Sequence, residues 1–262
     1  MMLSVWRNRD LIFHLAKHDV IGRYKGSVFG IFWSFINPLA LLTIYTFVFS
    51  VVFEAKWGVG NESKTQFAVL LFAGMIVHGL FTETLIRAPS LMVSLASYVK
   101  KIVFPLEILP VIALGASFFH AVVSILVLIA AFLCFQGVVH LTALLFPFIL
   151  LPLMLMSLGV AWFLASLGVF IRDVNQPIAL LMTILLFASP VFYPTSALPD
   201  YIQPWLILNP LTFIIEQTRA VLIFGEFPNL QGLAIYLAVA FVVAWAGYFW
   251  FQKTRKGFAN VL

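Results

Sequence analysis

The stretch LTALLFPFILLPLMLMSLGVAWFLASLGVFI, residues 141–171, decides the fold class of this chain. It holds no Asp, Glu, Lys, Arg or His, and it is longer than the roughly 20 apolar residues with which one helix crosses a bilayer. The whole chain of 262 residues is 63% hydrophobic and only 10% charged, with a mean hydropathy of +1.08. A soluble domain of this size carries about a quarter charged residues and cannot cover so much apolar surface. These figures predict an all-α integral membrane protein.

Five more apolar runs flank this stretch, and they predict six transmembrane helices in a single domain, 1–262. The runs cover residues 30–53, 67–86, 106–135, 176–193 and 230–251. At about 20 residues for each span, little of the chain remains for a soluble catalytic domain. Pro147 and Pro152 each lack a backbone donor, so a kink is expected within 141–171.

The basic residues predict the orientation, because cytoplasmic loops carry an excess of Lys and Arg. Twelve of them fall on one side of the six spans: Arg7, Arg9, Lys17, Arg23, Lys25, Arg87, Lys100, Lys101, Arg172, Lys253, Arg255 and Lys256. The other side has three, Lys56, Lys64 and Arg219. Both termini are therefore expected in the cytoplasm, with spans one to five in 30–193 and a cytoplasmic tail at 252–262.

The N-terminal segment, residues 1–29, is charged and aromatic and precedes the first apolar run. On a helical wheel its apolar and polar side chains fall on opposite sides. The apolar side holds Ile12, Phe13, Leu15, Ala16 and Val20, and the polar side holds Asp10, His14, Lys17 and His18. This pattern predicts an amphipathic interface helix at the cytoplasmic headgroups.

Residues 194–229 do not fit a plain helical hairpin, because prolines divide the region into apolar runs too short to span a bilayer. The prolines from 190 onward are Pro190, Pro194, Pro199, Pro204, Pro210 and Pro228. Irregular backbone at membrane depth persists only where it is buried in protein or faces water. We therefore expect two short re-entrant helices in the outer leaflet, near 197–208 and 211–224, with Glu216 and Arg219 on one face of the second.

Missing motifs exclude several functions. The chain has no G-x-x-x-x-G-K-[ST] sequence to hold nucleotide phosphates, and no H-E-x-x-H, G-x-S-x-G or C-x-x-C sequence. His14 and His18 have a metal-compatible spacing but no third ligand, and Cys134 is the single cysteine, so no metal site is predicted. The basic residues flank helices, which indicates topology rather than nucleic-acid binding. We expect a protein that is not an enzyme and holds no cofactor of its own.

Few ionisable residues lie inside the apolar runs, and each such residue is costly at membrane depth. Among them are His78, Glu83 and His120, with Arg87 directly after the second run, and Glu83 and Arg87 are spaced for an ion pair at the end of a helix. The chain lacks an acidic relay near the midplane, which argues against a proton- or sodium-coupled transporter. It also lacks the polar cluster that a membrane-embedded transferase needs.

Aromatic residues without neighbouring charge are a candidate channel lining. Trp33 and Tyr45 lie in the first run, and Phe187, Phe192 and Tyr193 lie at the end of the fifth. Such rings can stack weakly against the C–H faces of sugars in a pore, although Trp and Tyr at helix ends also serve as interface anchors.

The order of several short motifs resembles that of the permease subunits of ABC type-2 polysaccharide exporters, a family that exports O antigen, capsule and teichoic acid. The motifs are RYKGSVFG at 23–30 with Trp33 and Asn37-Pro38, KKIVFP at 100–105 with Leu109-Pro110, FIRD at 170–173, the region from Ser189-Pro190 to Asn209-Pro210-Leu211, and GFANVL at 257–262. Together they cover nearly the whole chain. O antigen is the favoured cargo, and the choice among the three glycans stays open.

The resemblance implies an assembly of two copies of this chain and two separate ATPase subunits, which would hold the ATP and Mg²⁺. It implies ATPase coupling through the loop 90–104, with Ser90, Tyr98, Lys100 and Lys101, and an outer gate formed by Pro194, Pro199, Asn209, Pro210, Glu216 and Arg219. It places the channel lining on the first and fifth spans, at the aromatic residues named above.

The cargo implied by the resemblance is a glycan on a lipid, undecaprenyl diphosphate, that crosses the bacterial inner membrane. Arg23 and Lys25 are the candidates to receive its charged head group, by charge and location. Two alternatives stay open: an ABC exporter permease for another substrate, and a channel or secondary transporter that works without an ATPase.

Overall fold

The computed structural model describes residues 2–52, 64–94, 104–137 and 139–261, and within these ranges every regular element is a helix. The α-helices are α1 (Met2–Arg7), α2 (Arg9–Tyr24), α3 (Trp33–Tyr45), α4 (Lys64–Arg87), α5 (Leu91–Ser94), α7 (Leu109–Gln136), α8 (Phe146–Phe170), α9 (Asn175–Ala188), α10 (Thr212–Arg219), α11 (Leu230–Thr254) and α12 (Phe258–Val261). Short 3₁₀ segments join them: η1 (Gly30–Phe32), η3 (Ala88–Ser90), η4 (Leu106–Ile108), η5 (Leu141–Leu145), η6 (Arg172–Val174), η7 (Thr195–Ala197), η8 (Gln203–Leu208) and η10 (Arg255–Gly257). Two segments, η2 (Thr46–Val52) and η9 (Ala220–Phe224), are π-helical.

Among the described residues, five helical segments are long and apolar enough to cross a membrane. They are Gly30–Phe49, Gln66–Ser94, Leu106–Phe135, Leu141–Phe170 and Leu230–Gly257. These segments match the first four predicted runs and the last one, and the chain is a multi-pass membrane protein by this measure.

The fifth predicted run, 176–193, is shorter in the structure than expected. Helix α9 has 14 residues, a length of about 21 Å at 1.5 Å per residue. It ends at Ala188 because Ser189 precedes Pro190 and takes an extended conformation, with ψ at 152°. The residues beyond it continue as turns toward η7.

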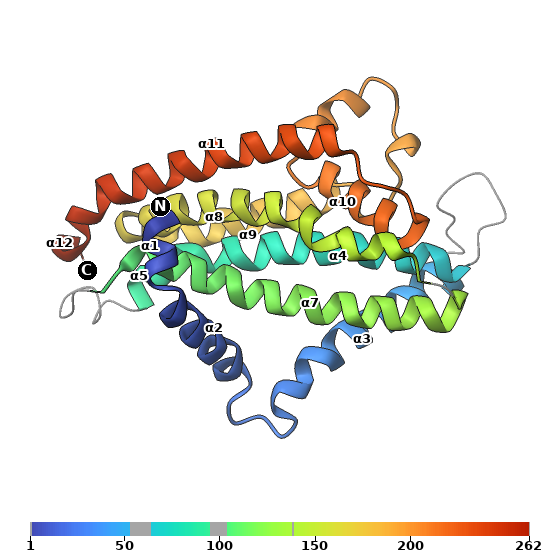
Figure 1. Cartoon of the computed structure of the whole chain (residues 1–262), viewed down its shortest axis with the longest axis horizontal. Coiled ribbons are helices and arrows are strands. Elements are labelled where there is room, and N and C mark those ends of the chain that lie inside the picture. Colours follow the sequence, from blue (N-terminus) through green and yellow to red (C-terminus); the bar gives the residue numbers. More distant parts are fainter. Residues whose placement is uncertain (1, 53–63, 95–103, 138, 262) are drawn as a thin grey trace.

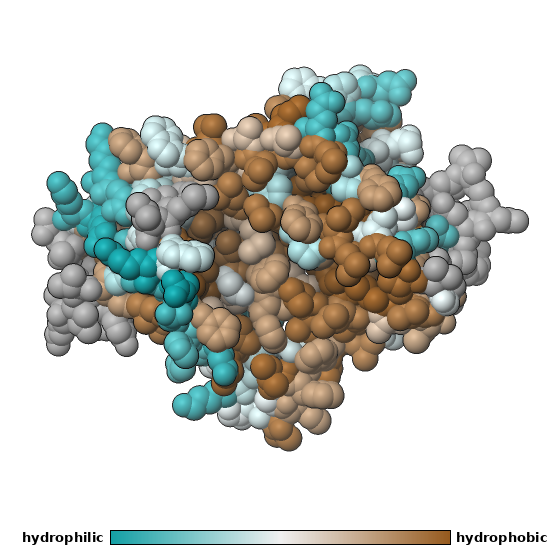
Figure 2. Space-filling view, viewed as in Figure 1, coloured by the Kyte–Doolittle hydropathy of each residue, from teal (hydrophilic) through white to brown (hydrophobic). Residues whose placement is uncertain are grey.

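Helix α4 is the centre of the bundle (Figure 1). It packs against α7, α8, α9 and α10, and against α3 with its extension η2. In the most apolar part of the segment Gln66–Ser94, which contains α4, 72% of the residues are buried. The corresponding share is 17% for the first and the last of the five segments. The apolar side chains of α3 and α11 therefore form outer surfaces, and the face seen in Figure 2 is largely apolar between two polar ends.

Helices α8 and α11 approach each other closely through glycine. A Cβ on Gly247 would lie 2.0 Å from the carbonyl oxygen of Gly159, and a Cβ on Gly159 would lie 2.6 Å from Cα of Ala244. Small residues at such crossings let two backbones touch and gain dispersion contacts in a membrane. Pro147 lies in the first turn of α8, where the missing donor costs nothing, and α8 continues through Pro152 to Phe170.

The predicted N-terminal helix is present as α2, and it packs against the bundle. Val20 is buried, and Ala16 lies against Gly115 of α7, whose added Cβ would be 3.3 Å away. Phe13, expected on the packed side, is 67% exposed instead. Helices α2 and α3 form a V whose tip is the connection around Gly26, where φ is +89° (Figure 1).

The proline-rich region is helical in part. The expected helix near 197–208 is replaced by the 3₁₀ segments η7 and η8, because Pro199 and Pro204 each remove a donor that an α-helix requires. The expected helix near 211–224 is present as α10 and η9. This region lies at the end of the molecule opposite both termini, which share one end (Figure 1).

Candidate functional site

A cluster of ion pairs ties α2 to the bundle at the end where the termini lie. Arg23 of α2 donates to Glu83 of α4, and Arg87 of α4 donates to Asp19 of α2 at 2.8 Å. His120 of α7 lies 3.1 Å from Glu83. Arg23 also lies 3.7 Å from Asp19 within α2. Each of the two helices α2 and α4 thus supplies one cation and one anion to the pairs between them. The sequence suggested a Glu83–Arg87 pair along one helix, whereas the structure joins each of them to α2.

A cavity of about 380 Å³ opens beside this cluster, between α2, α3, α4 and α7. Arg23, Tyr24, Asn37, Glu83 and His120 supply its polar lining. The Tyr24 hydroxyl lies 3.2 Å from Nε2 of His120, and burial raises the pKa of this hydroxyl above its ordinary value. The cavity thus carries both charges and neutral donors at its rim.

The two basic residues predicted to receive the head group have different surroundings. Arg23 lines the cavity, but its guanidinium is already engaged by Glu83 and Asp19. Lys25 is exposed on the connection after α2. The connection between α2 and α3 therefore carries one positive charge held in ion pairs, that of Arg23, and one on an exposed side chain, that of Lys25.

Three of the five aromatic residues predicted to line the channel form a continuous row with a residue that the sequence analysis missed. Phe49 of η2 lies 6.4 Å from Tyr45 and 6.0 Å from Phe192, measured between ring centroids. Phe192 stacks on Phe187 at 5.5 Å with 23° between the rings. The row links the far end of the first span to the end of α9, and no periodicity in the sequence singled out Phe49.

The other two predicted aromatic residues lie outside this row. Trp33 is at the start of α3, where its ring meets Phe29 edge to face at 5.7 Å. Tyr193 donates its hydroxyl to the carbonyl of Phe187 at 2.9 Å and so closes the turn after α9. A hydrogen bond from His78 of α4 to the carbonyl of Met182 holds α9 in place at 3.1 Å.

Arg219, predicted in the outer gate, is buried and joins three segments of the chain through hydrogen bonds. Its guanidinium donates to the carbonyls of Leu70, Pro190 and Val191 at 2.9, 2.6 and 3.0 Å. Gly74 makes room for it, because a Cβ there would lie 3.0 Å from Nη2 of Arg219. Glu216 lies three residues earlier on the same helix and attracts Arg219 electrostatically. Its side chain lines a pocket that Arg219 does not line. The two residues therefore interact through their charges, although their side chains have different surroundings.

The remaining gate residues also fix the turns around α9 and α10. The Asn209 amide donates to the carbonyl of Ala188 at 3.1 Å and to the hydroxyl of Ser189 at 2.9 Å. The carbonyl of Pro199 accepts from Ile202 and Gln203, and that of Pro210 accepts from the hydroxyl of Tyr236. Pro194 directly precedes η7.

A buried carboxylate that the sequence analysis passed over joins the two ends of the chain. Glu107 of η4 accepts from Ser4 of α1 at 2.7 Å and from Arg255 of η10 at 2.9 Å. Its carbonyl accepts from the indole of Trp162 at 2.9 Å. An acidic residue at the start of a span is ordinary in a sequence, so only the fold reveals this role.

The comparisons agree with the architecture described above. The sequence profile of the ABC-2 type transporter family matches residues 10–223, most of the chain. The chain belongs to the ABC-2 type transporter family. An O-antigen export system permease protein RfbA from Myxococcus xanthus is 24% identical over 262 residues, with 99% of this chain and 98% of that protein covered. A protein of the same name from Klebsiella pneumoniae is 26% identical over 255 residues, with 97% and 95% covered.

The ABC-2 profile ends at residue 223, so it covers the chain from α2 almost to the end of η9 and leaves out α11. The ion-pair cluster, the aromatic row and Arg219 all lie within it. Of the predicted coupling residues in this ABC-2 permease, Ser90 is exposed in η3 and donates to the carbonyl of Arg87 at 2.9 Å. Tyr98, Lys100 and Lys101 lie outside the described residues.

Proposed function

We propose that this ABC-2 permease is the channel-forming subunit of an ATP-driven exporter that carries lipid-linked O antigen across the bacterial inner membrane. The observation that carries the proposal is the similarity, over almost the full length of both chains, to permeases named for O-antigen export. The aromatic row from Tyr45 to Phe187 supports it, since rings without charge give a glycan weak contacts that permit sliding.

The active unit is a pair of these chains. Large apolar side chains on α3 and α9 face outward, among them Phe35, Ile44, Leu180 and Ile184. Both helices flank α4, so two copies that meet along this face enclose a passage between their first and fifth spans. The exposed apolar side chains of α11 face lipid in this arrangement.

The topology that fits this proposal has six crossings with both termini in the cytoplasm. The termini share one end of the molecule, which supports an even number of crossings, with α9 added to the five long segments as the fifth in chain order (Figure 1). Its helix of about 21 Å is shorter than the hydrocarbon core of about 30 Å, so the turns at Ser189–Tyr193 would complete the crossing. The excess of Lys and Arg supports a cytoplasmic location for the end with the termini. Segments η8 and α10 then form the re-entrant outer gate.

ATP chemistry belongs to two partner ATPase subunits, which bind ATP and Mg²⁺ below the permease pair. Their expected contact surface comprises the loop 90–104 together with α1 and α2. The ion pairs of Asp19, Arg23, Glu83 and Arg87 carry movement of α2 to α4, the centre of the bundle. Nucleotide binding then shifts the channel between states of different affinity for the glycan.

The diphosphate of the lipid anchor is received near the V formed by α2 and α3. Lys25 is exposed there and attracts the anionic head group, while Arg23 becomes available when its pairs with Glu83 and Asp19 open. The cavity of about 380 Å³ beside them offers polar partners for the first sugar.

The decisive experiment deletes this chain from its host, restores it from a plasmid, and measures surface glycan together with intracellular lipid-linked glycan. The expected result is loss of glycan from the surface and accumulation on its lipid inside the cell, both reversed by the plasmid. Unchanged glycan in both compartments, in a host with no second exporter, would refute the proposal. An accumulated capsule or teichoic acid precursor would keep the export mechanism and replace O antigen as cargo.

A further inference from the structure

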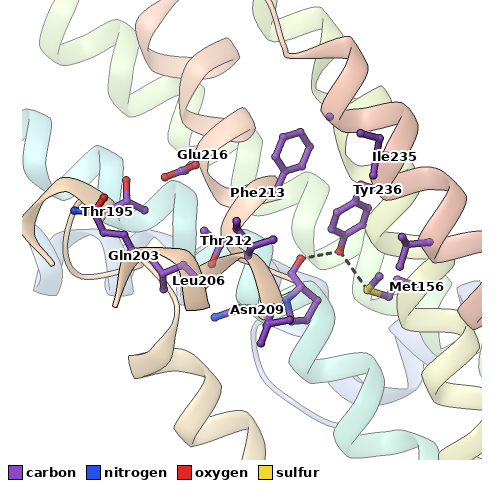
Figure 3. Close-up of a pocket in the computed structure, with 15 residues that line it drawn as sticks. Met156, Thr195, Gln203, Leu206, Asn209, Thr212, Phe213, Glu216, Ile235 and Tyr236 are labelled. Atoms are coloured by element: carbon purple, nitrogen blue, oxygen red, sulfur yellow. Dashed lines mark hydrogen bonds between the residues drawn. The ribbon is translucent and has the colours of Figure 1, made fainter. Parts of the chain in front are cut away.

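A second pocket, of about 550 Å³, lies between η8, α10 and the first turns of α11, at the end opposite the termini (Figures 1 and 3). Its volume falls in the range of small-molecule sites, about 300–1,000 Å³. It is separate from the aromatic row and from the cavity near α2, because it shares no lining residue with either.

One wall of the pocket is an ordered aromatic pair. Phe213 of α10 stacks on Tyr236 of α11 with ring centroids 6.0 Å apart and 22° between the rings. The Tyr236 hydroxyl donates to the carbonyl of Pro210 at 2.7 Å and lies 3.3 Å from the sulfur of Met156 (Figure 3). Gly232 lets the two helices meet here, since a Cβ there would lie 2.6 Å from the ring of Phe213. The wall is therefore fixed before any ligand binds.

Hydrogen-bonding groups also line the pocket. The Glu216 carboxylate is one of them (Figure 3), and it accepts no hydrogen bond from any residue that the structure describes. The Gln203 amide donates to the carbonyl of Leu198 at 2.9 Å, which leaves its oxygen available as an acceptor. The Thr212 hydroxyl is buried and has no partner among the described residues, and Thr212 is one of the residues that line the pocket.

The charge of the lining selects the class of ligand. Glu216 is negative, and the lining contains no Lys, Arg or His, so a phosphate or another anionic head group is disfavoured. An acyl chain would leave the carboxylate and the amide buried without partners, which costs free energy. A ring with hydroxyl groups on its edge and C–H groups on its face satisfies both walls, because the face of an aromatic ring is electron-rich.

We propose that this pocket binds one neutral or cationic pyranose ring, with its C–H face on Phe213 and Tyr236 and its hydroxyls donating to Glu216. This inference rests on the proposed export function, because it makes the pocket an outer subsite for a sugar of the emerging glycan. Glu216 thereby acts in recognition of the sugar, whereas Arg219, three residues away, acts in packing.

The test uses the full chain in lipid nanodiscs free of glycolipid, and saturation-transfer difference NMR with methyl α-D-glucopyranoside, methyl α-D-mannopyranoside and D-glucuronate as probes. At least one of the two neutral glycosides should receive saturation, strongest at the C–H protons of one ring face. D-glucuronate has the same ring as glucose with an added negative charge, so it should bind more weakly.

Matched variants separate the pocket from the rest of the surface. Glu216→Gln should weaken binding of the neutral glycoside about tenfold, the typical effect of losing a hydrogen bond to a charged group, and should reduce the discrimination against glucuronate. Phe213→Leu should also weaken binding. The controls are Glu226→Gln and Phe227→Leu, exposed residues nearby that do not line the pocket and should leave binding unchanged.

Thr212→Val keeps the test valid if the other variants misfold, because it replaces an unpartnered hydroxyl by a methyl group of the same shape. It should leave the unfolding temperature unchanged or higher and still weaken binding. No saturation transfer to either neutral glycoside, or equal transfer in the pocket variants and their controls, would overturn the proposal. Occupancy by a lipid tail predicts that result.

The outcome is separable from that of the export proposal. If the glycosides fail to bind but deletion of the chain still removes surface glycan, the pocket is no sugar subsite and the export function stands. If they bind to the pocket but deletion leaves surface and internal glycan unchanged, export fails and the sugar site remains.

Discussion

The guanidinium of Arg219 donates to the carbonyl of Pro190 at 2.6 Å and so fastens α10 to the turn that ends α9. Pro190 forces Ser189 out of the helical conformation, which leaves carbonyls at this turn without helical partners. The buried guanidinium of Arg219 supplies several donors and satisfies the carbonyls of Pro190 and Val191. Nε of Arg219 also donates to the carbonyl of Leu70 in α4, so the same side chain joins α10 to α4.

Replacing Arg219 by Met should destabilise the fold. The variant removes the hydrogen bonds from Arg219 to three carbonyls, and the expected loss is about 2–4 kcal/mol of unfolding free energy, the order of one or two hydrogen bonds to a charged group. Thermal unfolding in nanodiscs measures it, with Arg172→Met, an exposed arginine, as control. Equal melting temperatures for the two variants would show that Arg219 does not hold α10.

Gly74→Ala should produce a related defect, because its Cβ would lie 3.0 Å from Nη2 of Arg219 and 3.3 Å from Cα of Val191. The control is Gly79→Ala in the same helix, where nothing lies within 4 Å of the added atom. Alanine favours a helix over glycine by about 1 kcal/mol. We expect Gly79→Ala to keep or raise the melting temperature and Gly74→Ala to lower it, so the same sign for both would contradict the packing argument.

Glu83→Gln should uncouple the permease from its ATPase partner without unfolding it. The neutral amide no longer attracts Arg23 and His120, so α2 loses part of its hold on α4 and α7. We expect export and transport-linked ATP hydrolysis to fall between about 5- and 100-fold, the range of typical coupling energies. Asp10→Asn on the exposed side of α2 is the control, and an equal effect of the two changes would rule out a specific role for the cluster.

Lys100→Glu combined with Lys101→Glu should reduce export and transport-linked ATPase rate and leave membrane insertion intact. Reversed charges on the expected coupling loop disturb contact with the ATPase subunit rather than the fold of the bundle. Cell-surface glycan and ATPase rate are the measurements, and Lys253→Glu with Lys256→Glu, at exposed positions near the C-terminus, is the control pair. Normal export by the Lys100 and Lys101 variant would remove the coupling assignment.

The apolar runs were sufficient to predict most of the architecture, because the length of a span is set by the bilayer and is visible in composition. The boundaries of α4, α7, α8 and α11 follow the predicted runs closely. The exception, α9, ends early for a local reason that the sequence does contain, the Ser189-Pro190 pair. The missing α-helix near 197–208 has the same origin in Pro199 and Pro204.

Side-chain partners could not be predicted, because every face of these helices is apolar and periodicity assigns none of them to the interior. Arg219 was predicted to share a helix face with Glu216, yet its buried position depends on Gly74, 145 residues earlier in the chain. Phe49 and Glu107 carried no signal beyond their residue type. Their roles arise where η2 meets α9 and where η4 meets both ends of the chain.

The close contact between Gly159 and Gly247 fixes the distance between α8 and α11, and this distance can serve as a reference for movements of the other helices. With backbone against backbone, α8 and α11 cannot separate without opening a void, so spin labels on their exposed faces should keep one distance in every nucleotide state. Labels placed from α11 to α3 or α9 will then report displacement of those helices alone. A change in such a distance, compared with the constant distance between α8 and α11, then reports movement of α3 or α9, the helices proposed to line the passage.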